Sequence, residues 1–156
     1  MKIRMGTPAD AASVAALLNQ LIEHRDGTAL TEPVSVAGEA SYIRCLLPAG
    51  CLLLAEDAVS LLGFQSVDRL NPELGEIGTF VRRESRGTGV GTALLQETWS
   101  WAEQEGIGAL LADIDERNVP GLRAYRAWGF TEPDADWLNF NEQFPVPGKI
   151  LLVSTA

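Results

Sequence analysis

The stretch Arg86-Gly87-Thr88-Gly89-Val90-Gly91 decides how this sequence folds, because its alternating glycines stand directly before a helical pattern over residues 90–105. Glycine lacks a Cβ, so it adopts positive φ at little cost and lets a ligand approach the backbone closely. The first N–H groups of a helix have no partner within the helix and lie at the positive end of its dipole. The stretch therefore predicts a phosphate or pyrophosphate site, with a flexible glycine-rich cap as the alternative.

Two other phosphate-binding patterns fit this stretch poorly. A P-loop requires a lysine directly after its last glycine, and none follows here. A dinucleotide-binding fold requires Gly-x-Gly-x-x-Gly directly after an N-terminal strand, whereas these glycines alternate and lie beyond residue 80.

The charge of the chain is distributed unevenly. With 12 Lys+Arg and 21 Asp+Glu the net charge is −9, which repels phosphate backbones and anionic lipid and argues against nucleic-acid or membrane-surface partners. Cationic small molecules suit it better. Even so, arginines gather near the glycines, which favours a ligand with several phosphates, although some would be ordinary surface residues: Arg82, Arg83, Arg86, Arg117, Arg123 and Arg126.

Apolar periodicity on both sides of the glycines predicts the remaining elements. On the N-terminal side we expect a strand at 3–5, a helix from a Thr7 capping box to about residue 25, a helix at 36–46, and strands at 52–55, 61–67 and 74–81. On the C-terminal side we expect a strand at 109–114, a helix at 119–128, and strands at 137–140 and 150–153.

This order predicts an α/β fold: one domain over residues 1–156, with a mixed, mostly antiparallel sheet flanked by helices on both faces. Short turns would join the strands from 52 to 81 in antiparallel fashion. The strand–helix–strand segment over 74–114 requires a parallel, right-handed crossover.

Two motifs in this order resemble the GCN5-related N-acetyltransferase (GNAT) superfamily. The stretch 86–91 is similar to its acyl-CoA signature Arg/Gln-x-x-Gly-x-Gly/Ala. Residues 118–130, Asn-Val-Pro-Gly-Leu-Arg-Ala-Tyr-Arg-Ala-Trp-Gly-Phe, are similar to its second signature, Asn-x-x-Ala-x-x-x-Tyr-x-x-x-Gly-Phe. Gly121 departs from the usual alanine. The resemblance is good over residues 74–130, and the rest of the chain matches the family only in the order of its helices and strands.

The resemblance implies the GNAT fold and acetyl-CoA as cosubstrate, with no metal. The pyrophosphate would lie on the backbone of the segment made up of Arg86, Gly87, Thr88, Gly89, Val90, Gly91 and Thr92. The pantetheine arm would pair like a strand with the backbone near Phe80 and Val81, between splayed strands at 74–81 and 109–114. Gly75 and Gly78 are consistent with a bulge there. Asn118 would cap its helix and contact the cofactor.

The resemblance also implies roles in transferring acetyl to an amine. Tyr125 would be the general acid for the departing thiolate, and a backbone N–H near Phe80 and Val81 would hold the developing oxyanion. Glu76 is the leading base, on the same strand face as Gly78 and Phe80; Asp113, Asp115 or a water chain are alternatives. With no Ser/His/Asp or Cys/His nucleophile set, transfer would be direct within a ternary complex.

The acceptor is less well defined by sequence. The resemblance assigns its pocket to 23–33, 71–73 and 133–147, whose acidic and aromatic residues suit a small cationic or amino-acid-like amine. His24 either lines the entrance or lies on the surface. A protein N-terminus or lysine as acceptor stays open, as do a non-catalytic acyl-CoA sensor and an unrelated nucleotide-binding protein.

The location of the protein is predicted from absences. No apolar run approaches the length of a membrane span, and the first residues lack the features of a signal peptide. Cys45 and Cys51 suggest neither a zinc site nor a disulfide. We therefore expect a cytoplasmic protein, and leave open a homodimer formed through exposed sheet edges or helices.

Overall fold

The computed structural model describes residues 1–26, 28, 30–144 and 146–156, which form a six-stranded sheet in the order β1-β2-β3-β4-β5-β6. All neighbouring strands are antiparallel except β4 and β5, which are parallel as predicted. The mixed, mostly antiparallel sheet is thus confirmed. The strands are β1 (Lys2–Met5), β2 (Cys51–Glu56), β3 (Leu61–Asn71), β4 (Leu74–Val81), β5 (Ala109–Asp115) and β6 (Lys149–Thr155).

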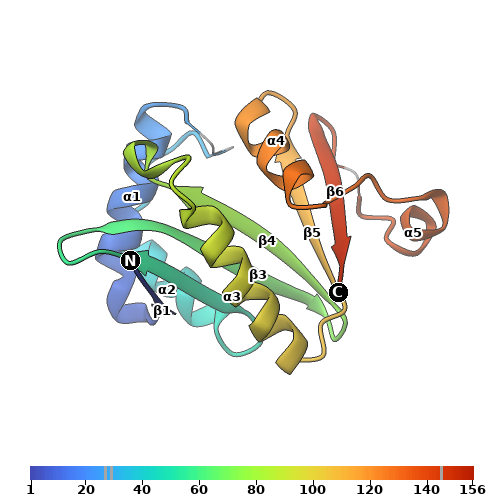
Figure 1. The fold of residues 1–156 in the computed structure, drawn as a ribbon, viewed down its shortest axis with the longest axis horizontal. Coiled ribbons are helices and arrows are strands. Elements are labelled where there is room, and N and C mark those ends of the chain that lie inside the picture. The colour runs from blue at the N-terminus through green and yellow to red at the C-terminus, as the bar shows by residue number, and fades with distance from the viewer. Residues whose placement is uncertain (27, 29, 145) are drawn as a thin grey trace.

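Helices cover both faces of the sheet (Figure 1). On one face lie α1 (Ala11–Glu23) and α2 (Val36–Leu46), and on the other α3 (Val90–Gln104) and α4 (Val119–Ala127). Short 3₁₀ turns, Pro8–Asp10 and Arg83–Ser85, precede α1 and the glycine-rich stretch. The predicted capping box is present: the Thr7 amide donates to the Asp10 carboxylate at 2.9 Å.

Two buried apolar layers hold these helices to the sheet. On the α1/α2 face, Leu17, Leu18 and Ile43 pack against alternate residues of β2 and against Phe64. On the α3/α4 face, Leu94, Leu122 and Phe130 belong to one buried cluster with the opposite side chains of the same strands. Because successive strand residues point to opposite faces, each strand serves both layers.

β4 and β5 pair over only a short length, from Leu74 opposite Ala109 to Glu76 opposite Leu111, and then diverge (Figure 1). The predicted splay is therefore confirmed. The predicted bulge at Gly75 and Gly78 is wrong, because β4 keeps an unbroken register with β3 there and the irregularity lies in β3, between Arg69 and Asn71. Gly75 is required by packing instead: a Cβ there would meet Val67 Cγ1 at 2.5 Å.

The predicted strand at 137–140 is also wrong, because this segment forms the short helix α5 (Ala135–Phe140). Asp134 caps it by accepting a hydrogen bond from the Trp137 amide at 2.8 Å. Adjacent Trp137 and Leu138 both pack on the buried cluster around Leu111. A strand would send adjacent side chains to opposite faces, so a helical turn is the conformation that buries both together.

The two cysteines are not joined in a disulfide. Cys45 is exposed, Cys51 is buried, and both are free. Among the helices that the structure describes, none combines the length and the apolarity needed to cross a membrane.

Candidate active site

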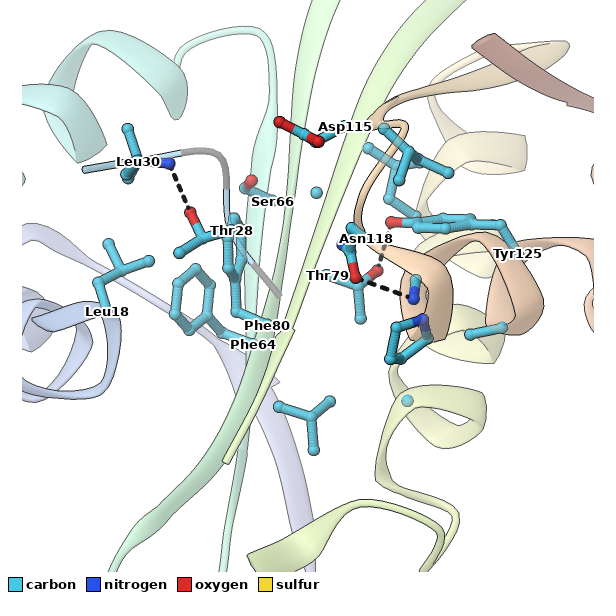
Figure 2. A pocket seen from close by; sticks show the side chains of 18 of the residues that line it. Leu18, Thr28, Leu30, Phe64, Ser66, Thr79, Phe80, Asp115, Asn118 and Tyr125 are labelled. Atoms are coloured by element: carbon cyan, nitrogen blue, oxygen red, sulfur yellow. Dashed lines mark hydrogen bonds between the residues drawn. The ribbon is translucent and has the colours of Figure 1, made fainter. Parts of the chain in front are cut away.

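A cavity of about 970 Å³ extends over the gap between β4 and β5. At one end lies the glycine loop, residues 86–92. At the other lies the acidic end, which we define as Glu39, Tyr42, Asp68, Glu76 and Asp113 together with Lys149. Figure 2 shows the region between them, with Phe64 and Phe80 on one side and Tyr125 and Asn118 on the other.

The glycine loop presents its backbone to the cavity. Gly87 and Gly89 have φ values of +72° and +90°, and a Cβ on either would meet no atom within 4 Å. The amides of 87–92 make no hydrogen bond to a described residue; the next amide, of Ala93, donates to the Gly89 carbonyl at 3.0 Å. Open amides at the N-terminus of a 15-residue helix are the geometry that the predicted anion site requires.

Arg86 holds this loop in place. Its guanidinium pairs with Asp26, just beyond α1, at 2.5 Å, and its Nε donates to the Val81 carbonyl at 3.2 Å. The side chain thus ties the loop to both α1 and β4 while also lining the cavity.

The wider arginine cluster does not surround the cavity. Arg82 donates to the Leu61 carbonyl, and Arg117 pairs with Asp115 at 2.9 Å. Of the six arginines that the sequence groups together, Arg86 alone is among the described cavity-lining residues. Five of the six arginines thus lie outside the described lining, and the glycine loop presents mainly backbone amides to the cavity.

The open edge of β4 supplies further backbone groups. The Arg82 amide donates to the Leu62 carbonyl at 2.8 Å, and the β3–β4 register continues unbroken from this pair. In an antiparallel ladder, alternate residues direct their N–H and C=O groups to the same neighbour. Thr79 and Val81 therefore direct theirs at the gap, whereas the Phe80 amide faces β3 and its ring stacks on Phe64 at 4.8 Å.

Tyr125 extends from α4 to the middle of the cavity (Figure 2). The residue is only 6% exposed, and its hydroxyl lies 2.7 Å from Thr79 Oγ1. Burial raises the pKa of the phenol well above its usual value, partly opposed by the Thr79 hydrogen bond. The hydroxyl therefore keeps its proton at neutral pH.

Asn118 begins α4 beside the same part of the cavity. Its Oδ1 accepts a hydrogen bond from the Gly121 amide at 3.1 Å, so the predicted capping role is confirmed. A Cβ on Gly121 would come within 2.5 Å of Asn118 Nδ2. The departure from the family motif at Gly121 thus leaves room for the carboxamide that caps the helix.

Glu76 is half-buried on β4, directly across the ladder from Asp68. Burial raises the pKa of its carboxyl, and repulsion from Asp113 and Asp68 raises it further, while Lys149 opposes the shift. A raised pKa makes the Glu76 carboxylate a stronger base than that of an ordinary glutamate.

The two alternative bases differ in their surroundings. The Asp113 side chain is 4% exposed, its Oδ2 lies 3.7 Å from Lys149 Nζ, and its Oδ1 has no hydrogen-bond partner among the described residues. Burial raises the pKa of Asp113, whereas the bonds from Arg117 lower that of Asp115 to about 2. Asp115 is therefore a poor base, and Asp113 stays an alternative to Glu76.

Glu76 and Asp113 were expected at the site, but the other residues of the acidic end come from outside the ranges expected for the acceptor pocket. α2 contributes Glu39 and Tyr42, β3 contributes Asp68, and β6 contributes Lys149, which lies 3.7 Å from Asp113. Residues 71–73 and the described part of 133–147, which were expected here, are absent from its lining. Alternation along β3 places Ser66 and Asp68 on one face, and that signal was available in the sequence.

Two other expectations concern His24 and metal ions. His24 is exposed at the C-terminal end of α1, away from the described cavity lining, so the surface alternative holds. Within the described ranges, no group of three or more His, Cys, Asp or Glu side chains is placed to hold a metal ion.

Comparison with known sequences identifies relatives of this chain. The model of the Acetyltransferase (GNAT) family matches residues 16–130. An aminoglycoside N(6')-acetyltransferase type 1 from Stenotrophomonas maltophilia is 31% identical over 139 residues, 85% of this chain and 87% of the relative. An L-methionine sulfoximine/L-methionine sulfone acetyltransferase from Pseudomonas aeruginosa is 28% identical over 135 residues, 82% of this chain and 78% of the relative.

Comparison with solved structures gives the same fold. A GNAT superfamily phosphinothricin acetyltransferase from Sinorhizobium meliloti, in complex with AcCoA, superposes with a TM-score of 0.80. It is 19% identical, and the match covers 99% of this chain and 87% of that one. The family model and the 31% identical relative, which agree with this fold, show that this chain belongs to the GNAT family of acetyltransferases.

Proposed function

We propose that this protein transfers the acetyl group of acetyl-CoA directly to the primary amine of a small cationic or amino-acid-like metabolite, with both substrates bound at once. The observation that carries the proposal is that one cavity joins the glycine loop, the gap between β4 and β5, and the acidic end. Relatives named for aminoglycoside and methionine sulfoximine acetylation support a small-molecule acceptor.

The described residues fit acetyl-CoA, which supplies the acetyl group as a thioester. The open amides of 87–92 suit a pyrophosphate, because N–H groups at a helix start bind anions without a charged side chain. The backbone of Thr79 and the N–H of Val81 offer the open strand edge that an extended pantetheine arm needs, while the Val81 carbonyl accepts from Arg86. Asn118 lines the cavity beside this edge and would contact the same arm.

The β4 edge supplies a hydrogen-bond donor for the thioester carbonyl, and Tyr125 supplies a proton for the departing sulfur. The Val81 N–H faces the gap and is the backbone donor we assign to the developing negative charge on the carbonyl oxygen. Tyr125 keeps its proton at neutral pH and gives it to the sulfur as the carbon–sulfur bond breaks.

Glu76 is the base in this proposal. An amine arrives mostly as an ammonium, since its pKa is near ~10, and must lose a proton before its lone pair can form the new carbon–nitrogen bond. The Glu76 carboxylate, whose pKa is raised, accepts that proton at the acidic end. Asp113 is the alternative acceptor of the proton.

Direct transfer is supported by the side chains that line the cavity. An acetyl-enzyme intermediate would need an activated nucleophile, such as a cysteine or serine beside a histidine. No cysteine or histidine is present in the described lining of the cavity. Cys51 is buried elsewhere, and burial raises the pKa of its thiol to about 12.

The charges of the acidic end support a cationic acceptor. Four carboxylates, those of Glu39, Asp68, Glu76 and Asp113, attract a cationic amine, and Lys149 is placed to pair with a carboxylate. A purely cationic acceptor would use the carboxylates alone, whereas an amino-acid-like one would also use Lys149.

The experiment that tests this function measures release of free coenzyme A thiol from acetyl-CoA with a panel of amines. The panel contains diamines, aminoglycosides, amino acids and a peptide with a free N-terminus and a lysine. We expect turnover with small amines and intersecting initial-rate lines when both substrates are varied. Parallel lines would contradict direct transfer, and turnover of the peptide alone would contradict a small-molecule acceptor.

A variant at Lys149 distinguishes amino-acid acceptors from purely cationic ones. Ligand binding measured beside turnover distinguishes an enzyme from a non-catalytic sensor. Lys149→Met should raise KM for an amino-acid acceptor and leave a diamine unaffected or improved. Stabilisation of the fold by acetyl-CoA without turnover of any amine would favour a sensor. Stabilisation by ATP or NAD without a larger effect of acetyl-CoA would contradict the proposal.

A further inference from the structure

A chain of buried polar side chains leads from α3 to Tyr125. The Thr98 hydroxyl donates to Gln65 Oε1 at 2.6 Å, Gln65 Nε2 donates to Thr79 Oγ1 at 3.1 Å, and Thr79 Oγ1 lies 2.7 Å from the Tyr125 hydroxyl. Thr98 and Gln65 are both 0% exposed. The chain thus crosses from α3 through β3 and β4 to α4.

Burying the Gln65 amide and the Thr98 hydroxyl costs folding free energy unless each group forms a hydrogen bond. Neighbouring positions on the same face of the sheet, such as Val67 and Ile77, are apolar and belong to the core that packs on α3. A leucine or methionine at position 65 would fill the same space without a polar group. The amide is therefore suited to a task that an apolar side chain could not perform.

The direction of the hydrogen bonds indicates that task. Thr98 donates to Gln65 Oε1, so the amide nitrogen of Gln65 faces Thr79. This nitrogen donates a hydrogen bond to the Thr79 hydroxyl oxygen, which therefore acts as an acceptor toward Gln65. A hydroxyl has one proton to give. Thr79 can then give that proton to the oxygen of Tyr125, which leaves the phenolic proton free to point into the cavity.

The reversed amide would have the opposite effect. If Gln65 Oε1 accepted the proton of Thr79, the Thr79 oxygen would be left to accept the phenolic proton of Tyr125. That proton would then point away from the cavity. Moreover, once Tyr125 has given up its proton, the buried phenolate needs a donor, and only the observed direction supplies one.

We propose that Gln65, held by Thr98, is a positioning residue for the reaction. Through Thr79, it directs the proton of Tyr125 into the cavity and stabilises the phenolate that remains after the proton has moved to the sulfur. This inference rests on the proposed function of Tyr125 as the acid. Protons and charges balance without a further group. The phenol loses the proton that the thiolate gains, the amine nitrogen releases its second proton as it becomes an amide, and one proton taken up from solvent restores the phenol before the next turnover.

The test is a double-mutant cycle read by the single-turnover rate of acetyl transfer at saturating acetyl-CoA. Thr79→Val and Gln65→Met remove the donors with little change of shape. Each should slow transfer about tenfold, since a hydrogen bond to a charged group is lost. In the Tyr125→Phe background, the same substitutions should change the rate by less than about twofold.

Two controls separate positioning from damage to the core. Thr79→Ser keeps the hydroxyl and should retain most of the rate. Val67→Ala makes a cavity on the same face of β3, outside the described cavity lining, and should lower Tm while changing the rate by a similar factor in both backgrounds. If Gln65→Met does not fold, Thr98→Val, which removes the hydroxyl that holds the Gln65 amide, takes its place in the cycle.

The outcomes distinguish this inference from the proposed function. If Tyr125→Phe transfers acetyl as fast as the native protein, the acid role of Tyr125 and this inference are both overturned. If Tyr125→Phe is slow but the other substitutions cost the same factor in both backgrounds, the chain is only structural. In that case the acid role stands and the positioning role is overturned.

Discussion

The glycine loop and the acidic end are built in different ways, although they belong to one cavity. The loop offers backbone amides from consecutive residues, 87–92, and its geometry depends on left-handed glycines. The acidic end collects side chains from α2, β3, β4, β5 and β6. A backbone site can be encoded within one short stretch, whereas a side-chain site depends on how distant segments pack.

This contrast predicts that each end can be impaired without the other, and the largest effect is expected at the acidic end. Glu76→Gln removes the proposed base while keeping its shape, and kcat should fall about 100-fold. The dissociation constant for acetyl-CoA should not change, because the glycine loop is untouched. Calorimetry and steady-state assays measure the two quantities, and a parallel loss of acetyl-CoA binding would remove the distinction.

At the other end, Gly89→Ala should weaken acetyl-CoA binding about tenfold, because it strains a left-handed residue and places a methyl group in open space beside the amides. At saturating acetyl-CoA, kcat should stay near native. Gly106→Ala is the matched control: Gly106 has φ +76°, lies just after α3 and has nothing within 4 Å of its Cβ position. It should lower Tm without altering binding, and equal weakening by both would contradict an amide cradle at Gly89.

A smaller effect, in the pH profile, sharpens the assignment of the base. Activity requires the ionised carboxylate, so kcat/KM should fall as the pH drops through the raised pKa of Glu76. Asp113→Asn removes a charge that raises that pKa, so this limb should move to lower pH with activity retained. Loss of activity without a shift would make Asp113 the base. Glu116→Gln, an exposed change of equal charge, should leave the profile in place.

The smallest effect concerns stability. The pKa of Glu76 is raised in the folded protein, so its contribution to stability is present at low pH and is lost as the pH rises through the folded value. Glu76→Gln should therefore raise Tm by about 2 °C near pH 7 and have little effect near pH 4. Calorimetry at both pH values checks this, and an equal change at both would show that ionisation is not the cause.

Local patterns predicted most of the elements well. The alternating glycines, the cap at Asn118 and the apolar periodicity of α3 each act within a few residues, so their signals are complete in the sequence. The segment at 137–140 was misread because two adjacent apolar residues look the same in a strand and in a helical turn. What decided between them was the cluster around Leu111, far away in the chain.

The sequence by itself determined the order of elements, the glycine loop and the position of Tyr125, because each depends on backbone geometry or spacing within one stretch. Only the tertiary structure decided that Glu39, Asp68, Glu76 and Asp113 share one end of the cavity, and that Gln65 reaches Thr79. The physical reason is that these contacts depend on the register of neighbouring strands and on which helix covers which face. Those relations arise when distant segments pack together, and no local pattern records them.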